Sequence, residues 1–447
     1  MALPIAAVVC GLLQVVSSRP LDPDTYETRV LARAATLEAA REARRAAESE
    51  VDLAETHRIP RLEVFARGVL LSETESAALG RLVAAPPETP PGPLAPGTPL
   101  SNVPIRLGAS PDTAWSVGAR VGVPLVDHLV RFPAVSRAAR AGATAAEAAE
   151  ARALADRRLE AALEFAAFVD ARARSEVARQ ALELLEAHRV DAVTRERLGV
   201  GTAADRTAVD AALAVAEVDR LRAAHGATMA MDRLRIALGD PVGTTYTPVP
   251  GPDRMPPTVD DAAALRARPE LAMLRARVEA EGALGDVARA SLWPRLDAFG
   301  EVTLARPGDR SFPPSETAEP AWQAGLVLSY TLSDGLEGEA TMRLRAARRA
   351  EAEAEQRALD ESLSLQISRA RQAVREADAT RAARSTSVMA AEEALRVRIA
   401  LASAGTATAT ERLTAEMAVT SARFAQVEAE TAVRTARARL LHALAGP

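Results

Sequence analysis

Two short stretches, Ile59-Pro60-Arg61-Leu62 and Trp293-Pro294-Arg295-Leu296, each open a segment in which apolar and polar residues alternate. After Arg61 the apolar side chains fall mainly at every second position, and the same alternation follows Arg295. A period of two is typical of a β-strand with one apolar and one polar face. Proline ends the helical segment before the first stretch, because it lacks the N–H donor that a helix needs. We therefore expect a strand after each stretch, and the chain uses this pattern twice.

The two halves of the chain repeat each other in order and in spacing. Ala114-Trp115 recurs as Ala321-Trp322, and Asp205-Arg206 recurs as Glu411-Arg412. The distance from Trp115 to Gly199 is 84 residues, and the distance from Trp322 to Gly405 is 83. The alternative, compositional bias, would not preserve this register. We expect a signal peptide at 1–18, a first structural repeat at 19–239, a proline-rich linker at 240–258 and a second structural repeat at 259–447.

Four strands are expected, at about 61–71, 114–124, 295–305 and 321–332. Each is about 10 residues long, which suits a strand that is tilted across a bilayer. One face of each strand is apolar, whereas the other carries charges such as Arg120 and Glu301. The alternative is a soluble sheet with one wet face. The side chains that would face the membrane are Leu62, Val64, Trp115, Val117, Val121, Leu296, Val302, Trp322, Leu326, Leu328 and Tyr330.

Each pair of strands is separated by a loop, and the two loops differ in length. The segment 73–113 carries nine prolines between Pro86 and Pro111, which predicts a long irregular excursion. The matching segment 305–320 is shorter. One long loop between paired strands is typical of the outer side of outer-membrane barrels. The alternative is a disordered linker inside a soluble domain, which would have the same sequence pattern.

Two proline-free stretches, 134–240 and 321–446, predict long helical hairpins. The first helix can run over 134–198, which at 1.5 Å per residue gives a rod of about 97 Å. Such a rod must pack along partners, as in a coiled coil or a bundle. Turns are expected at 199–202 and at 404–407, and the segment 24–57 is expected to be helical by composition.

The N-terminus and the overall composition narrow the function classes. Ala2–Val16 is almost uninterrupted apolar sequence, which suits a secretory signal peptide, with a buried terminal strand or helix as the alternative. Cys10 leaves lipidation or loss with the signal peptide open. The net charge of −5 argues against nucleic-acid binding, and all 55 basic residues are arginine, which excludes lysine chemistry. No catalytic constellation, cofactor site or metal site is expected, so we do not expect an enzyme.

Four strands cannot close a barrel by themselves, and an open sheet edge is not tolerated in lipid. If the strands lie in a membrane, several chains must share one barrel. Three copies would supply 12 strands and a matching ring of long helices. The sequence therefore favours a conduit.

In this order and spacing, the chain resembles the TolC-like outer-membrane efflux family from about Thr25 to Gly446. The motifs are the Pro-Arg-Leu strand entries, Arg268-Pro269-Glu270-Leu271, and the acidic residue that follows each hairpin glycine by six positions. Leu238-Gly239 and Ala445-Gly446 close the two halves. The resemblance implies a mainly α chain with a membrane β-barrel portion, in which a homotrimer forms a 12-stranded β-barrel continuous with a 12-helix α-barrel.

The resemblance also implies a location and partners. The barrel would lie in the lipid of the outer membrane of a Gram-negative-type cell, with the helical tunnel in the periplasm. The chain would be the passive exit duct of a tripartite efflux or type I secretion system. It would dock on a periplasmic adaptor (membrane fusion) protein and, through it, on an inner-membrane transporter. The exported substrate and the class of pump are not indicated.

By position, the resemblance implies a periplasmic gate and a docking surface. Glu411 is the best gate residue, Asp205 is its equivalent in the first hairpin, and Asp210 and Glu416 follow five residues on. Thr414 stands where the family's prototype has a second carboxylate. For Glu411 the alternative is a carboxylate that only stabilises a helix start. The adaptor would contact Arg197, Leu198, Gly199, Val200 and Gly201 on one turn, and Ala404, Gly405 and Thr406 on the other; generic turn chemistry is the alternative.

The competing class is a secreted or periplasmic coiled-coil scaffold protein without channel activity. In such a protein the rods would bind partners and the strands would form a small sheet. Fractionation with the outer membrane distinguishes the two classes.

Overall fold

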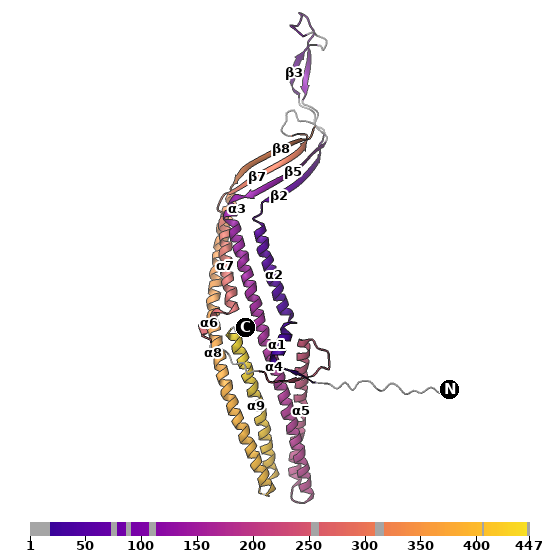
Figure 1. Cartoon of the computed structure of the whole chain (residues 1–447), viewed down its shortest axis with the longest axis vertical. Helices are drawn as coiled ribbons and strands as arrows, with labels where there is room; N and C mark the ends of the chain where they lie inside the picture. Colours follow the sequence, from indigo (N-terminus) through magenta and orange to yellow (C-terminus); the bar gives the residue numbers. More distant parts are fainter. Residues whose placement is uncertain are drawn as a thin grey trace, which may run out of the picture. The chain divides into compact units, whose positions relative to one another are not determined.

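The structure is a computed structural model that describes residues 18–72, 78–85, 91–106, 113–251, 259–308, 317–404 and 406–444 (Figure 1). Most of the proposed signal peptide, including Cys10, lies outside these residues, as do Gly405 and the closing Ala445-Gly446. The chain forms two compact units, one of residues 1–47, 142–278 and 351–447, the other of residues 48–141 and 279–350. Each unit takes segments from both halves of the sequence, so the two compact units do not correspond to the two sequence repeats.

Long helices dominate the structure, as the proline-free stretches predict. The segment expected to be helical over 24–57 is interrupted, because Arg33 N bonds to the carbonyl of Val30 in a tight turn. The helices are α1 (Pro23–Leu31), α2 (Ala35–Thr56), α3 (Leu125–Leu129), α4 (Arg131–Arg197), α5 (Ala203–Leu238), α6 (Asp261–Arg266), α7 (Pro269–Ala290), α8 (Leu332–Ser403) and α9 (Ala409–Ala443).

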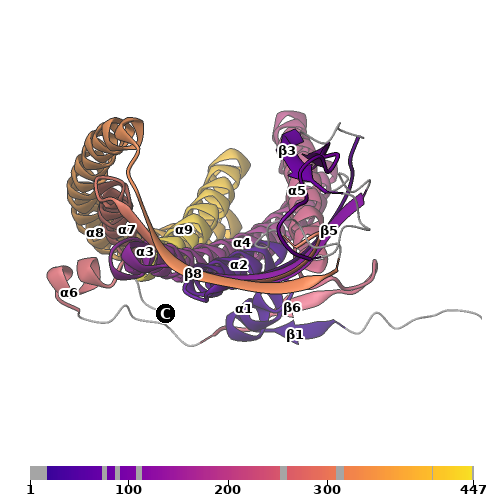
Figure 2. The same ribbon diagram turned by 90° about the horizontal axis from the view of Figure 1, so that it is seen from above.

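The second unit contains an antiparallel sheet with the order β2-β5-β7-β8, formed by the strands β2 (Arg61–Leu70), β5 (Thr113–Pro124), β7 (Arg295–Arg306) and β8 (Glu319–Ser329). These strands lie at the positions that the alternation predicts. Val64 lies opposite Ala119, and Val302 lies opposite Trp322. The central pair, β5 and β7, joins the two halves of the sequence. The strands curve along their length (Figures 1 and 2).

The expectation that 73–113 is irregular throughout is wrong. Two strands, β3 (Ala78–Ala84) and β4 (Ser101–Arg106), pair antiparallel within it. In the described residues between the two strands, Pro91, Pro93, Pro96 and Pro99 interrupt no ladder. Pro104 lies in β4 opposite Arg81, in a ribbon that has two strands in the described residues, and proline is confined to edge strands of this kind.

A second short pairing, which sequence patterns did not suggest, lies in the first unit. β1 (Arg19–Leu21) runs parallel to β6 (Tyr246–Pro248), a strand in the segment that follows α5. The start of the described chain is thereby attached to the segment expected to be the linker between the two repeats.

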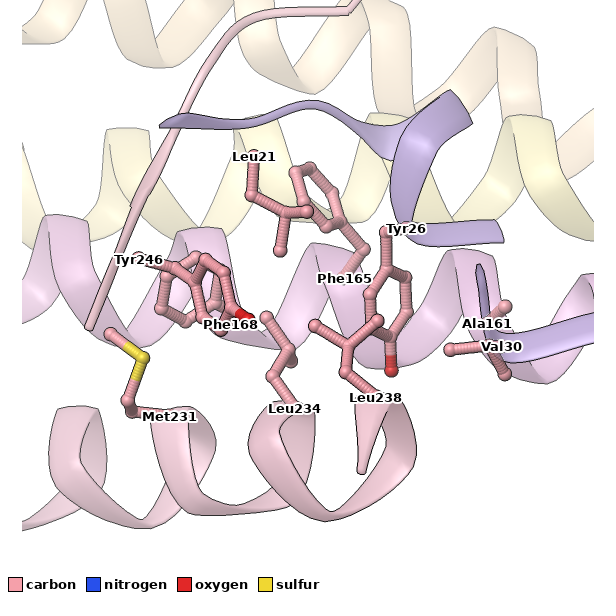
Figure 3. Close-up of a cluster of buried hydrophobic side chains, with 10 residues drawn as sticks. All are labelled: Leu21, Tyr26, Val30, Ala161, Phe165, Phe168, Met231, Leu234, Leu238 and Tyr246. Carbon is pink, nitrogen blue, oxygen red and sulfur yellow. The ribbon is translucent and has the colours of Figure 1, made fainter. Parts of the chain in front are cut away.

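The main core of the first unit gathers side chains from β1, α1, α4, α5 and β6 (Figure 3). Phe165 lies between Tyr26 and Phe168, with ring centroids 5.8 Å and 6.2 Å away. Burial of one such ring stabilises the fold by about 2–3 kcal/mol. The members are Leu21, Tyr26, Val30, Ala161, Phe165, Phe168, Met231, Leu234, Leu238 and Tyr246. The core fixes the last turns of α5 against the middle of α4.

A half-buried polar cluster borders this core. Arg29 donates from one nitrogen to both carboxylate oxygens of Asp240, at 2.9 and 2.8 Å, and the Tyr246 hydroxyl donates to the same carboxylate. Burial alone would raise the pKa of Asp240, but the hydrogen bonds from Tyr246 and Arg29 lower it. Asp240 follows Gly239, whose φ of 67° ends α5 in the left-handed conformation that glycine adopts without strain.

Candidate functional site

The four-stranded sheet has one apolar face, and most of the side chains expected to meet lipid are exposed on it. Leu62, Val64 and Trp322 are 72%, 74% and 72% exposed. Leu296 is half-buried, and Tyr330 lies one residue beyond the end of β8. Trp115, Val117, Val121, Val302, Leu326 and Leu328 are also exposed. Such a contiguous apolar face marks a surface that meets lipid or protein.

The opposite face of the same sheet is polar. Register places Glu63, Arg120, Glu301 and Gln323 in one row across the four strands. Arg120 donates from Nε to Glu301 Oε2 at 2.8 Å, and Gln323 donates to the same oxygen at 3.3 Å. The sheet therefore separates an apolar side from a charged side, as a wall between lipid and water requires.

The first hairpin turns between α4 and α5 through a glycine. Gly199 has φ 74°, and the N–H groups of Val200 and Gly201 both donate to the carbonyl of Arg195. This closes the end of α4 in the manner of a glycine C-cap. Leu198 and Val200 are 72% and 74% exposed, so the turn presents apolar side chains to its surroundings.

Each hairpin resumes with the same capping box. Thr202 and Asp205 exchange side-chain and backbone hydrogen bonds at the start of α5, and Thr408 and Glu411 do so at the start of α9. Glu411 Oε2 accepts from Thr408 N at 3.0 Å and lies 3.6 Å from Arg398. The helix-start role considered for Glu411 is therefore present in the structure, and Asp205 has the same role.

The second turn is described except for Gly405. The N–H of Ala404 donates to the carbonyl of Ala400 at 3.1 Å, and that of Thr406 donates to the carbonyl of Leu401 at 2.9 Å. Arg195 of α4 donates to the carbonyl of Ala402 at 3.2 Å. The two hairpin ends are therefore in direct contact within the first unit.

The two remaining carboxylates of the expected gate have different surroundings. Asp210 accepts from Arg189 at 2.6 Å and from Arg206 at 3.0 Å, and the hydrogen bond from Arg189 is the main reason that the pKa of Asp210 is lowered. Glu416 is only 1% exposed and contacts His188 Nδ1 at 2.8 Å and Arg412 Nε at 2.9 Å. A carboxylate that lines a tunnel must be open to water, so the gate role expected for Glu416 does not fit this burial.

Glu416 instead belongs to a network that joins α9 to α4. Arg412 also contacts Asp191 at 3.0 Å, and His188, on α4, is itself 2% exposed. A small apolar cluster of Leu185, Ala192, Val209 and Leu413 packs in the same region. Sequence reasoning did not single out His188. Its position three residues after Leu185 and four before Ala192 places it on the apolar face of α4, which is the signal that could have found it.

The described residues contain neither a helix that could span a membrane nor a cluster of metal ligands. None of their helices is both long and apolar enough to cross a membrane. Nor do three or more of their His, Cys, Asp and Glu side chains gather in a way that could hold a metal ion.

Comparison with known proteins gives a consistent result. Residues 262–446 match the family model described as outer membrane efflux protein. The fold is similar to the outer-membrane channel OprN, with 21% identity, a TM-score of 0.77 and 95% of this chain and 90% of that chain covered. It is also similar to the outer membrane protein VceC from Vibrio cholerae, with 18% identity, a TM-score of 0.75 and coverage of 95% and 96%. No curated protein matches this sequence.

A third similar structure is the Campylobacter jejuni CmeC outer membrane channel, with 14% identity, a TM-score of 0.76 and coverage of 95% of this chain and 85% of that chain. At these identities the structures establish the fold. Together with the family match over the second half, they confirm the resemblance that the motifs indicate.

Proposed function

Because the chain resembles TolC-like outer-membrane efflux proteins in sequence and in fold, we propose that it is the passive outer-membrane exit duct of a tripartite efflux or secretion system. Three copies form a 12-stranded barrel in the outer membrane and a 12-helix tunnel in the periplasm. The observation that carries the proposal is the two-faced sheet of β2, β5, β7 and β8, whose exposed apolar side chains need lipid and whose charged side needs water.

The edges of this sheet support the shared barrel. In the part of the chain that the structure describes, β2 and β8 each pair with one neighbour, which leaves one edge of each strand open. An open edge in lipid would leave backbone N–H and C=O groups without partners, at a cost of several kcal/mol each. The open edge of β8 in one copy pairs with the open edge of β2 in the next, and three copies close the ring.

The hairpin turns are proposed to be the periplasmic end of the duct. The adaptor docks on Arg197–Gly201 and on the second turn with Ala404, Gly405 and Thr406, and it connects the duct to an inner-membrane transporter. The exposed Leu198 and Val200 give the first turn an apolar contact surface. Asp205 and Glu411 form the gate rings by three-fold symmetry, because they stand at equivalent places in the two hairpins.

A ring of like charges attracts counter-ions and repels ions of the same sign. Glu411→Gln is a clean test of such a ring, since glutamine at this position of a capping box still accepts the bond from Thr408 N. We expect weaker cation preference in single-channel recordings from planar bilayers. Asp205→Asn is the matched variant in the first hairpin. Unchanged selectivity and conductance in both variants would remove these carboxylates from the gate.

Localisation tests the proposal as a whole. The mature protein is expected in the outer-membrane fraction, to require detergent for extraction, and to conduct ions after reconstitution. A coiled-coil scaffold without channel activity would fractionate with soluble proteins and conduct nothing.

A further inference from the structure

On the polar face of the sheet, two phenylalanines lie across glycines of the neighbouring strand. A methyl group placed on Gly118 would lie 2.7 Å from Cζ of Phe65, and one placed on Gly325 would lie 3.1 Å from Cε1 of Phe299. Register puts each ring directly opposite its glycine, since Phe65 pairs with Gly118 and Phe299 pairs with Gly325. Each ring therefore covers the backbone of the next strand.

The arrangement occurs once in each half of the sequence. Each phenylalanine follows the strand-entry proline by five residues, and each glycine follows the strand tryptophan by three. Placing an aromatic ring over a glycine compensates for the missing side chain and pins the register of the two strands. The recurrence shows that both halves contain the same ring-on-glycine contact.

The two rings lie beside a charged row. Glu63, Arg120 and Glu301 share a row, and the rows of Phe65 and Phe299 lie two residues away on either side of it. Arg120 and Glu301 neutralise each other by their ion pair. Both phenylalanines are half-buried, so part of each ring stays open on this face. The face is therefore polar with two apolar patches.

We propose that Phe65 and Phe299 form an aromatic contact surface on the inner wall of the duct, which binds small amphipathic molecules that carry an aromatic ring. This inference rests on the proposed function, which makes the polar face the lumen. In a trimer the two positions supply six rings around a charged belt. A passing molecule can stack its ring on them while its charged group stays near Glu63, Arg120 or Glu301, since aromatic pairs are favourable in offset or edge-to-face geometry.

The test uses purified trimers and two matched pairs of probes in ligand-observed saturation-transfer NMR. Benzyltrimethylammonium and benzenesulfonate carry a ring, whereas tetramethylammonium and methanesulfonate do not. We expect saturation transfer to the ring-bearing probes only. The double variant Phe65→Leu/Phe299→Leu keeps the apolar bulk but removes the rings, and it should weaken binding by about two- to tenfold, the range of one aromatic contact.

The control variant is Val69→Ala/Val327→Ala, which removes apolar side chains from the same face of β2 and β8. It should bind the probes like the wild type. Equal binding by the leucine variant and the wild type would overturn the inference, as would an equal loss in the control. The proposed function is checked separately in the same samples by ion conduction. Trimers that conduct ions but do not bind the ring-bearing probes would contradict the contact surface and leave the proposed function standing.

Gly325→Val adds a second, independent test. Its new side chain meets Phe299, whereas Gly122→Val adds the same volume to the same face with nothing within 4 Å. Gly122 also pairs with Phe299, across β5 and β7, so the first variant should alter probe binding more than the second. Gly118 is unsuitable, because a methyl group there would also lie 2.6 Å from the backbone oxygen of Val302. Identical binding by the two valine variants would argue against a ring seated on glycine.

Discussion

The two hairpin ends contain the same local motif and use it in different ways. Arg206 and Asp210 lie four residues apart at the start of α5, as Arg412 and Glu416 do at the start of α9. Arg206 reaches back to Glu196 and closes its own hairpin, whereas Arg412 reaches Asp191 of the other hairpin. The acidic partner is partly open to solvent in the first case and buried against His188 in the second.

The two hairpins therefore carry equivalent residues at equivalent positions, but the packing around each residue determines its role. An exposed ion pair contributes little to stability, because water and salt screen it. A buried carboxylate is costly unless all its neighbours satisfy it, so removing a partner is strongly destabilising. The second hairpin is therefore tied to the first by its buried pair. Three comparisons between the hairpins and one pH dependence test this difference.

The largest effect is expected for Glu416→Ala. The change leaves His188 without its carboxylate partner and deletes one contact of Arg412, at a cost of about 3 kcal/mol. Hydrogen exchange over the first turns of α9 measures the loss. The matched variant Asp210→Ala, at the equivalent place in α5, should leave exchange nearly unchanged. Equal effects in the two variants would contradict the difference in burial.

A somewhat smaller effect is expected for Arg412→Ala. It removes the link to Asp191 and leaves the buried Glu416 with His188 alone, which should cost about 2 kcal/mol because one bond of a buried group is lost. Exchange should rise in α9 and also in the part of α4 around His188, because the residue joins the two helices. Arg206→Ala is the control and should affect only the turn of the first hairpin. A rise confined to α9 would show that the network does not couple the helices.

The capping boxes should behave alike, because here the hairpins do not differ. Thr202→Ala and Thr408→Ala each remove the side-chain acceptor of an N-cap, at a cost of about 1 kcal/mol. Protection of the first-turn amides is the readout, and serine in place of threonine should retain it. A much larger loss in one hairpin would mean that one box also holds a contact outside its own helix.

The smallest effect is expected from pH. The pKa of Asp210 is lowered from its ordinary value of 3.8, mainly by the hydrogen bond with Arg189. A lowered pKa contributes stability above the unfolded value, and this stability is lost as pH falls through the folded value. Exchange of the α5 amides next to Asp210, corrected for its intrinsic pH dependence, should therefore rise slightly only below about pH 4. Asp210→Asn should remove this dependence, and its persistence would assign it to another group.

Much of the fold could be predicted because its signals are local. Alternation after Pro60 and Pro294 located β2 and β7, and the proline-free stretches located the hairpins. The β3–β4 ribbon was not predicted. The proline-rich composition of the segment indicates irregular structure, and the sequence of neither strand indicates that it pairs with the other.

The partners within the candidate site could not be predicted in the same way. His188 and Glu416 are 228 residues apart in sequence, and nothing local to either residue indicates the other. The contact of Phe299 with Gly325 likewise depends on strand register. Capping boxes are visible in sequence as Thr-x-x-Asp and Thr-x-x-Glu, but the sequence does not say whether these carboxylates also face a tunnel.

The central claim is that one chain supplies a third of a closed wall, and imaging of detergent-extracted particles tests it most directly. We expect a three-fold particle in which β8 of each copy pairs with β2 of the next, giving a closed barrel of 12 strands. A monomeric particle that carries no detergent, or an assembly in which these two edges stay apart, would contradict it.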